Sequence, residues 1–168
     1  MMDMTDLASP ERFRSYPRHE GRPFWFLGTL VHIRASTAET NGAFTLIEQL
    51  APAGFGPPLH VHHIEDELFY VLEGAVRFRC GDRDVRVESG GTLFLPKGVP
   101  HAFRVEGTEA ARLLQFTSPG GFDQLVETIG APAPAPTLPP AGPPPTGLLE
   151  RLASLGDRFH FAIVGPPL

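Results

Sequence analysis

Short apolar runs separated by glycine and proline fill the middle of the chain, between residues 21 and 118. They recur about every 8–12 residues with turn-forming residues between them, which is the spacing of strands in an all-β sandwich or barrel. Gly74 and Gly81 mark the clearest turns, because glycine tolerates positive φ. The pattern predicts strands at residues 24–33, 44–50, 68–72, 75–80, 84–87, 92–95, 102–105 and 112–116.

The two ends of the chain differ in composition from the middle. Residues 1–20 are charged and lack periodicity, which predicts a loosely held arm with at most one short helix after Pro10. Residues 131–146 contain eight prolines, and they predict an extended linker because proline lacks an amide hydrogen. Residues 148–155 have helical spacing and predict a helix ended by Gly156, and residues 159–164 could form one more strand.

These patterns divide the chain into three segments: an arm at 1–20, a barrel at 21–130, and a C-terminal segment at 131–168. Because an isolated short amphipathic helix is unstable in water, we expect the C-terminal segment to dock on the barrel or on a second subunit. With 168 residues and 42% hydrophobic content, the chain suits one domain with a buried core.

Charge and cysteine content narrow the possible partners. The net charge of −5 offers no basic surface for nucleic acid or for an anionic membrane. No apolar run approaches the roughly 20 residues of a membrane helix, and the polar N-terminus does not resemble a secretory signal. The single cysteine, Cys80, excludes an internal disulfide. We therefore expect a cytoplasmic protein with no nucleic-acid or membrane partner.

Four side chains with metal-binding donors are spaced so that strands could bring them together. His60 and His62 are two residues apart, so on a strand both side chains leave the same face. Glu67 opens the next apolar run, and His101 follows a Pro-Lys-Gly turn in a later glycine-rich stretch. Imidazole nitrogens and a carboxylate oxygen suit iron, nickel, manganese, cobalt, copper or zinc. We predict one divalent transition metal per chain, bound by His60, His62, Glu67 and His101.

Neighbouring residues leave some alternatives open. His63 points away from the face of His62 on a regular strand and is expected in solvent. Glu65 or Asp66 could replace Glu67 as a ligand if the turn after His62 is irregular. Asp66 is expected instead to accept a hydrogen bond from a neighbouring backbone group or histidine.

These residues match the two sequence motifs of the cupin superfamily, G-x5-H-x-H-x4-E-x6-G and G-x5-P-x-G-x2-H-x3-N. The second motif departs from the pattern at its last position, where Val105 replaces an asparagine that is not a metal ligand. More widely, the chain resembles bacterial single-domain cupins similar to quercetin 2,3-dioxygenase. This resemblance implies a jelly-roll barrel, usually a homodimer, with the metal inside the barrel mouth. The matching positions are Gly54, His60, His62, Glu67 and Gly74, then Gly90, Pro96, Gly98 and His101.

Strand alternation also predicts the wall of a pocket beside the metal. The inward phase is apolar and contains no clear Arg or Lys, which disfavours sugar-phosphate isomerases because these need cationic groups for the phosphate. An aromatic substrate is favoured instead. The predicted pocket residues are Phe69, Val71, Val76, Phe78, Phe103 and Val105, and Phe24, Trp25, Phe26, Phe44 and Phe55 could add aromatic contacts.

The sequence therefore predicts a metal-dependent dioxygenase that acts on a flavonol-like or other aromatic hydroxyl-bearing substrate with dioxygen. The resemblance to quercetinase-like cupins implies that Glu67 is both a metal ligand and the general base for the substrate hydroxyl. Two alternatives remain open because the same ligands support other chemistry. One is another metallo-cupin enzyme, such as a polyketide cyclase, a lyase or an isomerase, and the other is a non-enzymatic protein that binds a small molecule.

Overall fold

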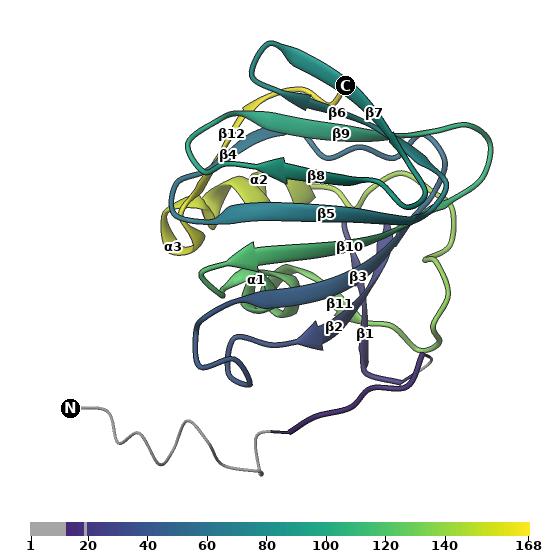
Figure 1. Ribbon diagram of the computed structural model, residues 1–168, viewed down its shortest axis with the longest axis vertical. Coiled ribbons are helices and arrows are strands. Elements are labelled where there is room, and N and C mark those ends of the chain that lie inside the picture. The colour runs from purple at the N-terminus through teal and green to yellow at the C-terminus, as the bar shows by residue number, and fades with distance from the viewer. Residues whose placement is uncertain (1–12, 19) are drawn as a thin grey trace.

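The computed structural model describes residues 13–18 and 20–168, and its strands form two antiparallel sheets that face each other (Figure 1). One sheet contains β1 (Arg22–Phe26), β2 (Thr29–Ala35), β3 (Thr45–Ala51), β5 (Asp66–Glu73), β8 (Thr92–Leu95), β10 (Ala111–Ser118) and β11 (Ala131–Pro132). The other contains β4 (Leu59–His62), β6 (Ala75–Cys80), β7 (Arg83–Glu88), β9 (His101–Glu106) and β12 (Phe161–Gly165). The strand orders are β11-β1-β2-β3-β10-β5-β8 and β12-β4-β9-β6-β7. This is the predicted all-β jelly-roll architecture.

The core lies between the sheets because each strand turns alternate side chains inward. In β3 and β10 the burial alternates residue by residue along the whole strand. On the opposite sheet Phe78 pairs with Phe103, so that both rings meet Phe69 from the first sheet, with ring centroids 5.3–5.7 Å apart. The cluster formed between the sheets contains Ala51, Phe69, Val71, Val76, Phe78, Val87, Leu95, Phe103, Val105, Ala111 and Leu113.

The predicted strand at residues 24–33 is instead the hairpin of β1 and β2. Phe26 pairs with Thr29, which leaves Leu27 and Gly28 as a two-residue turn with positive φ at both positions. Such a turn matches the twist of two antiparallel strands. The continuous apolar run concealed it because Leu27 is not a usual turn residue. The strands predicted at 75–80 and 92–95 have the observed bounds of β6 and β8.

The described residues form three short helices, which lie beside the strands (Figure 1). Helix α1 (Phe122–Ile129) was not predicted, whereas α2 (Leu148–Ser154) occupies the predicted helical segment. Gly156 was expected to end the helical segment, but it is instead the first residue of α3 (Gly156–Phe159). A Cβ at this glycine would lie 2.5 Å from the carbonyl oxygen of Phe161, so the close approach of the next strand requires glycine. No helix in the described part of the chain is long and apolar enough to cross a membrane.

The C-terminal segment packs against its own barrel. Strand β12 pairs with β4, and Leu152 and Phe161 are buried together with Phe26 and Leu125 in a second apolar cluster. The proline-rich stretch that precedes them begins as β11 alongside β1, and the Trp25 Nε1–H donates to the carbonyl oxygen of Thr137 (2.8 Å). Beyond β11 the stretch has neither helix nor strand up to residue 146, as expected of an extended linker.

The arm is held to the barrel where it is described. The guanidinium of Arg34 donates to the carbonyl oxygens of Arg18 (2.8 Å) and Glu20 (2.6 Å), and it also pairs with the Glu48 carboxylate at 2.8 Å. These contacts fix residues next to β1 without adding a strand. Residues 13–18 contain no helix, and the start of the segment after Pro10, where at most one short helix was predicted, lies outside the described residues.

We expect the docking of α2 to contribute measurably to stability. Leu152 is 6% exposed and Leu149 on the same helix is 50% exposed. The substitution Leu152→Ala should lower the free energy of unfolding by about 2–4 kcal/mol, because it leaves a cavity in a packed cluster. The matched control Leu149→Ala should change it by less than about 0.5 kcal/mol. Urea denaturation of both variants checks this, and equal effects would show that α2 is not docked as described.

Candidate metal centre

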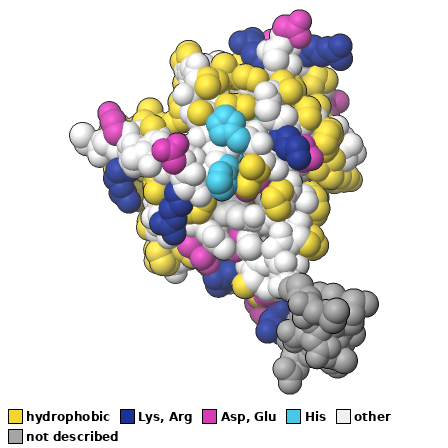
Figure 2. All heavy atoms as spheres, turned by 90° about the vertical axis from the view of Figure 1, so that its left-hand side faces the viewer, with side chains coloured by type: hydrophobic (Ala, Val, Ile, Leu, Met, Phe, Trp, Pro, Cys, Tyr) yellow, Lys and Arg dark blue, Asp and Glu magenta, His cyan; other side chains and the backbone are white. Residues whose placement is uncertain are grey.

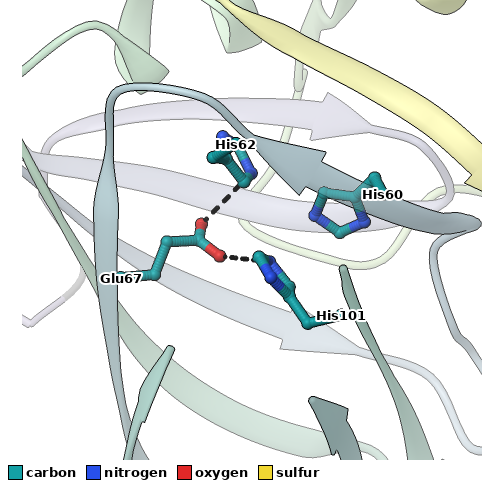
Figure 3. Close-up of side chains that lie close together, drawn as sticks. All are labelled: His60, His62, Glu67 and His101. Atoms are coloured by element: carbon teal, nitrogen blue, oxygen red, sulfur yellow. Dashed lines mark ion pairs between the residues drawn. The ribbon is translucent and has the colours of Figure 1, made fainter. Parts of the chain in front are cut away.

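The four predicted ligands converge between the two sheets at one end of the barrel (Figure 3). His60 and His62 lie on β4, and His101 is the first residue of β9, directly paired with His60. Glu67 is the second residue of β5 and faces them from the opposite sheet. The motif thus places three imidazoles on one sheet and one carboxylate on the other.

The potential ligand atoms of these four residues all lie within 4.8 Å of one another. Glu67 Oε2 is 2.8 Å from His101 Nε2, and Glu67 Oε1 is 3.6 Å from His62 Nε2. Glu67 is 2% exposed, His62 and His101 are equally buried, and His60 is partly buried. Only one such group of His, Cys, Asp and Glu side chains occurs among the described residues.

Each imidazole has an oxygen atom beside its Nδ1, on the side away from the carboxylate. An Nδ1–H that donates outward leaves the Nε2 lone pair directed into the site, and such partners usually fix the tautomer of a metal-binding histidine. The pairs are His60 Nδ1 with the Pro58 carbonyl at 2.8 Å, His101 Nδ1 with the Val99 carbonyl at 3.0 Å, and His62 Nδ1 with Glu65 Oε2 at 2.8 Å.

This arrangement fits a bound cation. With the proton on Nδ1, the Nε2 lone pairs of His62 and His101 face the oxygens of the Glu67 carboxylate. Two hydrogen-bond acceptors then face each other with no hydrogen between them. Both Nε2 atoms are buried and have no hydrogen-bond partner among the described residues. Unpaired buried acceptors are costly, and a divalent cation would satisfy them together. The donor set of three imidazoles and one carboxylate suits a transition metal and does not select a single one.

The charges of the group respond to burial and to one another. Burial alone would raise the pKa of Glu67, but the neighbouring His62, His101 and His60 outweigh it and lower this pKa to about 2. Burial and the adjacent imidazoles lower the pKa of His60 to about 4. For His62 burial acts downward, yet the carboxylates of Glu67 and Glu65 raise its pKa. The site therefore holds an ionised carboxylate and a neutral His60 at neutral pH.

The three acidic residues that follow His62 have different contacts. Glu67, and not Glu65 or Asp66, belongs to the four-residue group. Asp66 accepts a hydrogen bond from the backbone N–H of Lys97 (2.9 Å), as expected of a backbone contact, and Glu65 is the carboxylate beside His62. This role of Glu65 was not predicted, although its spacing of three residues from His62 was a signal.

His63 is exposed, as predicted. Its backbone N–H donates to the carbonyl oxygen of His160 (2.7 Å), which is the other exposed histidine of the described residues. Figure 2 shows histidine side chains at the surface of the molecule, next to hydrophobic side chains. In the second motif, Gly98 has a φ of 77°, and its N–H donates to the carbonyl oxygen of His62 (2.7 Å), which links the two motifs.

A cavity of about 670 Å³, which includes its open mouth, adjoins the four ligands. Its lining is apolar apart from the ligands and two glutamines, and it includes no Lys or Arg of the described residues. Helix α1, helix α2 and β12 supply a part of the wall that was not predicted from the sequence. The lining residues are Phe26, Leu27, Gln49, Phe55, Pro57, Pro58, His60, His62, Glu67, Phe69, His101, Phe103, Gln115, Phe122, Leu125, Leu152, Phe161 and Ile163.

Only some of the predicted pocket residues line this cavity. Phe69 and Phe103 do, as do Phe26 and Phe55. The other predicted members point inward but belong to the core beyond the rings of Phe69 and Phe103, because alternation gives the face of a strand and not the distance from the metal. These members are Val71, Val76, Phe78 and Val105. Phe24, Trp25 and Phe44 are not part of the lining either.

The two glutamines of the cavity were also missed. Gln115 on β10 donates from Nε2 to Glu67 Oε1 (2.6 Å) and so holds the carboxylate. Gln49 on β3 lies on the same sheet and is 5% exposed. The signal for both is a polar residue in the inward phase of an otherwise apolar strand.

We predict that the metal content of alanine variants distinguishes the three ligand histidines from the neighbouring His63. The substitutions His60→Ala, His62→Ala and His101→Ala should each remove most of the bound metal, because each deletes one of four donors. His63→Ala is the matched control and should retain it, since this side chain is exposed. Elemental analysis per chain makes the comparison. A His63→Ala variant as depleted as His62→Ala would contradict the assigned strand phase.

Comparisons with known proteins agree with this architecture. The cupin domain family matches residues 46–117. The quercetin 2,3-dioxygenase of Bacillus subtilis is 27% identical over 103 residues, which cover 61% of this chain and 30% of that protein. The tetracenomycin polyketide synthase protein TcmJ of Streptomyces glaucescens is 32% identical over 114 residues, covering 67% of this chain and 73% of that protein.

A solved structure from Thermotoga maritima, described as "a predicted oxalate decarboxylase", is similar with a TM-score of 0.58 and 22% identity, over 63% of this chain and 99% of that one. This likeness concerns the fold. The match to the Bacillus enzyme spans only 30% of its length, so it does not establish a shared activity. The family match contains all four predicted ligands. The chain therefore belongs to the cupin superfamily.

Proposed function

We propose that the protein is a metal-dependent dioxygenase that acts on a flavonol-like or other aromatic substrate bearing a hydroxyl group. The observation that carries this proposal is the position of three imidazoles and one carboxylate at an apolar, partly aromatic cavity without Lys or Arg in its described lining. A planar aromatic ligand gains most from such walls. The similarity to the Bacillus quercetin 2,3-dioxygenase supports the reaction class.

His60, His62, Glu67 and His101 would hold the metal. A divalent cation bound there would supply Lewis acidity, which makes an aromatic hydroxyl more acidic. The metal's identity depends on geometry and availability and not on these donors alone.

Glu67 is the group that would accept the hydroxyl proton. Its carboxylate is ionised at neutral pH and is fixed by the Nε2–H of Gln115 at Oε1. A general base has to be held within hydrogen-bond reach of the proton that it takes. Gln115 therefore acts as a positioning residue. The rings of Phe69 and Phe103 flank the substrate space and exclude water from it.

A second candidate function follows from the similarity to TcmJ, which has higher identity over a larger share of the relative. Its name associates it with a polyketide synthase, and an aromatic polyketide would also suit an apolar cavity. In this alternative the metal-bound protein is a cyclase, a lyase or an isomerase and consumes no dioxygen. Oxygen uptake by metal-loaded protein with flavonols distinguishes the two functions. Tight binding without turnover under any metal would instead indicate a binding protein.

Replacement of Glu67 tests the catalytic role. Glu67→Gln keeps the size and one oxygen donor but removes the basic carboxylate, and three imidazoles remain to bind metal. We expect this variant to keep a substantial fraction of its metal and to lose about 10²–10⁴-fold in oxygen uptake per bound metal. Glu73→Gln, at an exposed position of the same strand, is the matched control and should leave the rate unchanged. Equal metal-normalised rates for Glu67→Gln and the wild type would exclude Glu67 as the base.

We further propose a homodimer, as the family resemblance implies, in the cytoplasm, as the single cysteine favours. The expected result of light scattering at micromolar concentration is twice the mass of one chain. A monomer under these conditions would contradict the proposal without affecting the metal centre, since all four predicted ligands come from one chain.

A further inference from the structure

One hydrogen-bond acceptor in the cavity has no partner. Gln49 is 5% exposed, and its Oε1 is buried without a hydrogen-bond partner among the described residues. The side chain lines the same cavity as the four metal ligands. A buried amide oxygen of this kind is costly to leave unpaired, so its place in a binding cavity points to a ligand donor.

The orientation of this amide follows from its neighbours. The hydroxyl of Thr29 donates to the carbonyl oxygen of Phe26 (2.7 Å), so its single hydrogen is already used. The Thr29 oxygen can therefore only accept, and Gln49 Nε2 donates to it at 3.1 Å. The amide nitrogen must therefore face Thr29, and Oε1 is the atom of this amide that is left without a partner.

Gln49 also has a defined position relative to the ligand Glu67. On the pairing of β3 with β10, Gln49 lies opposite Leu113 and Gln115 lies opposite Ile47. The two glutamines are thus diagonal neighbours on one face, about 7–8 Å apart. Since Gln115 contacts Glu67, a row of polar side chains leads from the carboxylate across β10 to β3 along an otherwise apolar wall.

We propose that Gln49 Oε1 accepts a hydrogen bond from a second hydroxyl of the substrate, at the end remote from the metal, and thereby sets specificity. This inference rests on the proposed function for the aromatic class of ligand and adds the requirement for a second donor. A site built to pair with a hydroxyl discriminates strongly against the analogue without it, because the acceptor is then left unpaired.

The test compares two flavonols that differ by one hydroxyl on the remote ring, kaempferol with the group and galangin without it. Dissociation constants are measured by calorimetry with metal-loaded protein, so the readout is binding and not turnover. The wild type should bind kaempferol about 10–100-fold more tightly. Gln49→Leu, which removes the acceptor at similar size, should abolish this preference mainly by weakening kaempferol. Gln124→Leu, at an exposed position of α1, is the matched control and should keep it.

Further outcomes separate the inference about Gln49 from the proposed dioxygenase function. Equal affinity of the wild type for the two flavonols, or binding of neither, would overturn the inference even if Gln49→Leu failed to fold. A preference that depends on Gln49 without any oxygen uptake would support the inference and reject the dioxygenase. Oxygen uptake with an unchanged preference in Gln49→Leu would do the reverse.

Discussion

The burial of an ionised carboxylate among three imidazoles is the constraint on which the rest of the site depends. Glu67 is almost fully enclosed between two apolar sheets, where an isolated charge would be strongly unfavourable. The Nε2–H of Gln115 donates to it, and a divalent cation bound among the imidazoles would compensate its charge. The contacts of Gln115 and of the three imidazole Nδ1 atoms hold these groups facing one another.

The backbone provides much of this organisation. Two of the three imidazoles have their Nδ1 atoms beside carbonyl oxygens that lie two residues earlier in the chain, at Pro58 and Val99. The tautomer is thus set locally, before any metal is present. His62 differs, since its Nδ1 faces the carboxylate of Glu65. The centre therefore contains a second acidic group, which raises the basicity of one imidazole and not of the other two.

The ligands could be predicted from the sequence because their spacing is tied to strand geometry. Residues two apart on a strand share a face, and this rule placed His60 and His62 correctly on one side of β4. The same rule failed for Val71 and Val105, since it gives the side of a sheet and not the depth along the barrel. Nothing in the local pattern could show that α2 and β12 close the cavity, because their docking depends on contacts with distant residues such as Phe26.

The part of the chain that matches the cupin domain ends at residue 117, yet the cavity continues beyond it. The shared part carries the metal ligands and both glutamines, whereas Leu152, Phe161 and Ile163 come from the C-terminal segment. The metal ligands and one part of the cavity wall are therefore encoded in separate stretches of sequence. Substitutions in this appended wall can change which molecules fit while the metal ligands stay untouched, so the reaction and the choice of substrate can evolve independently.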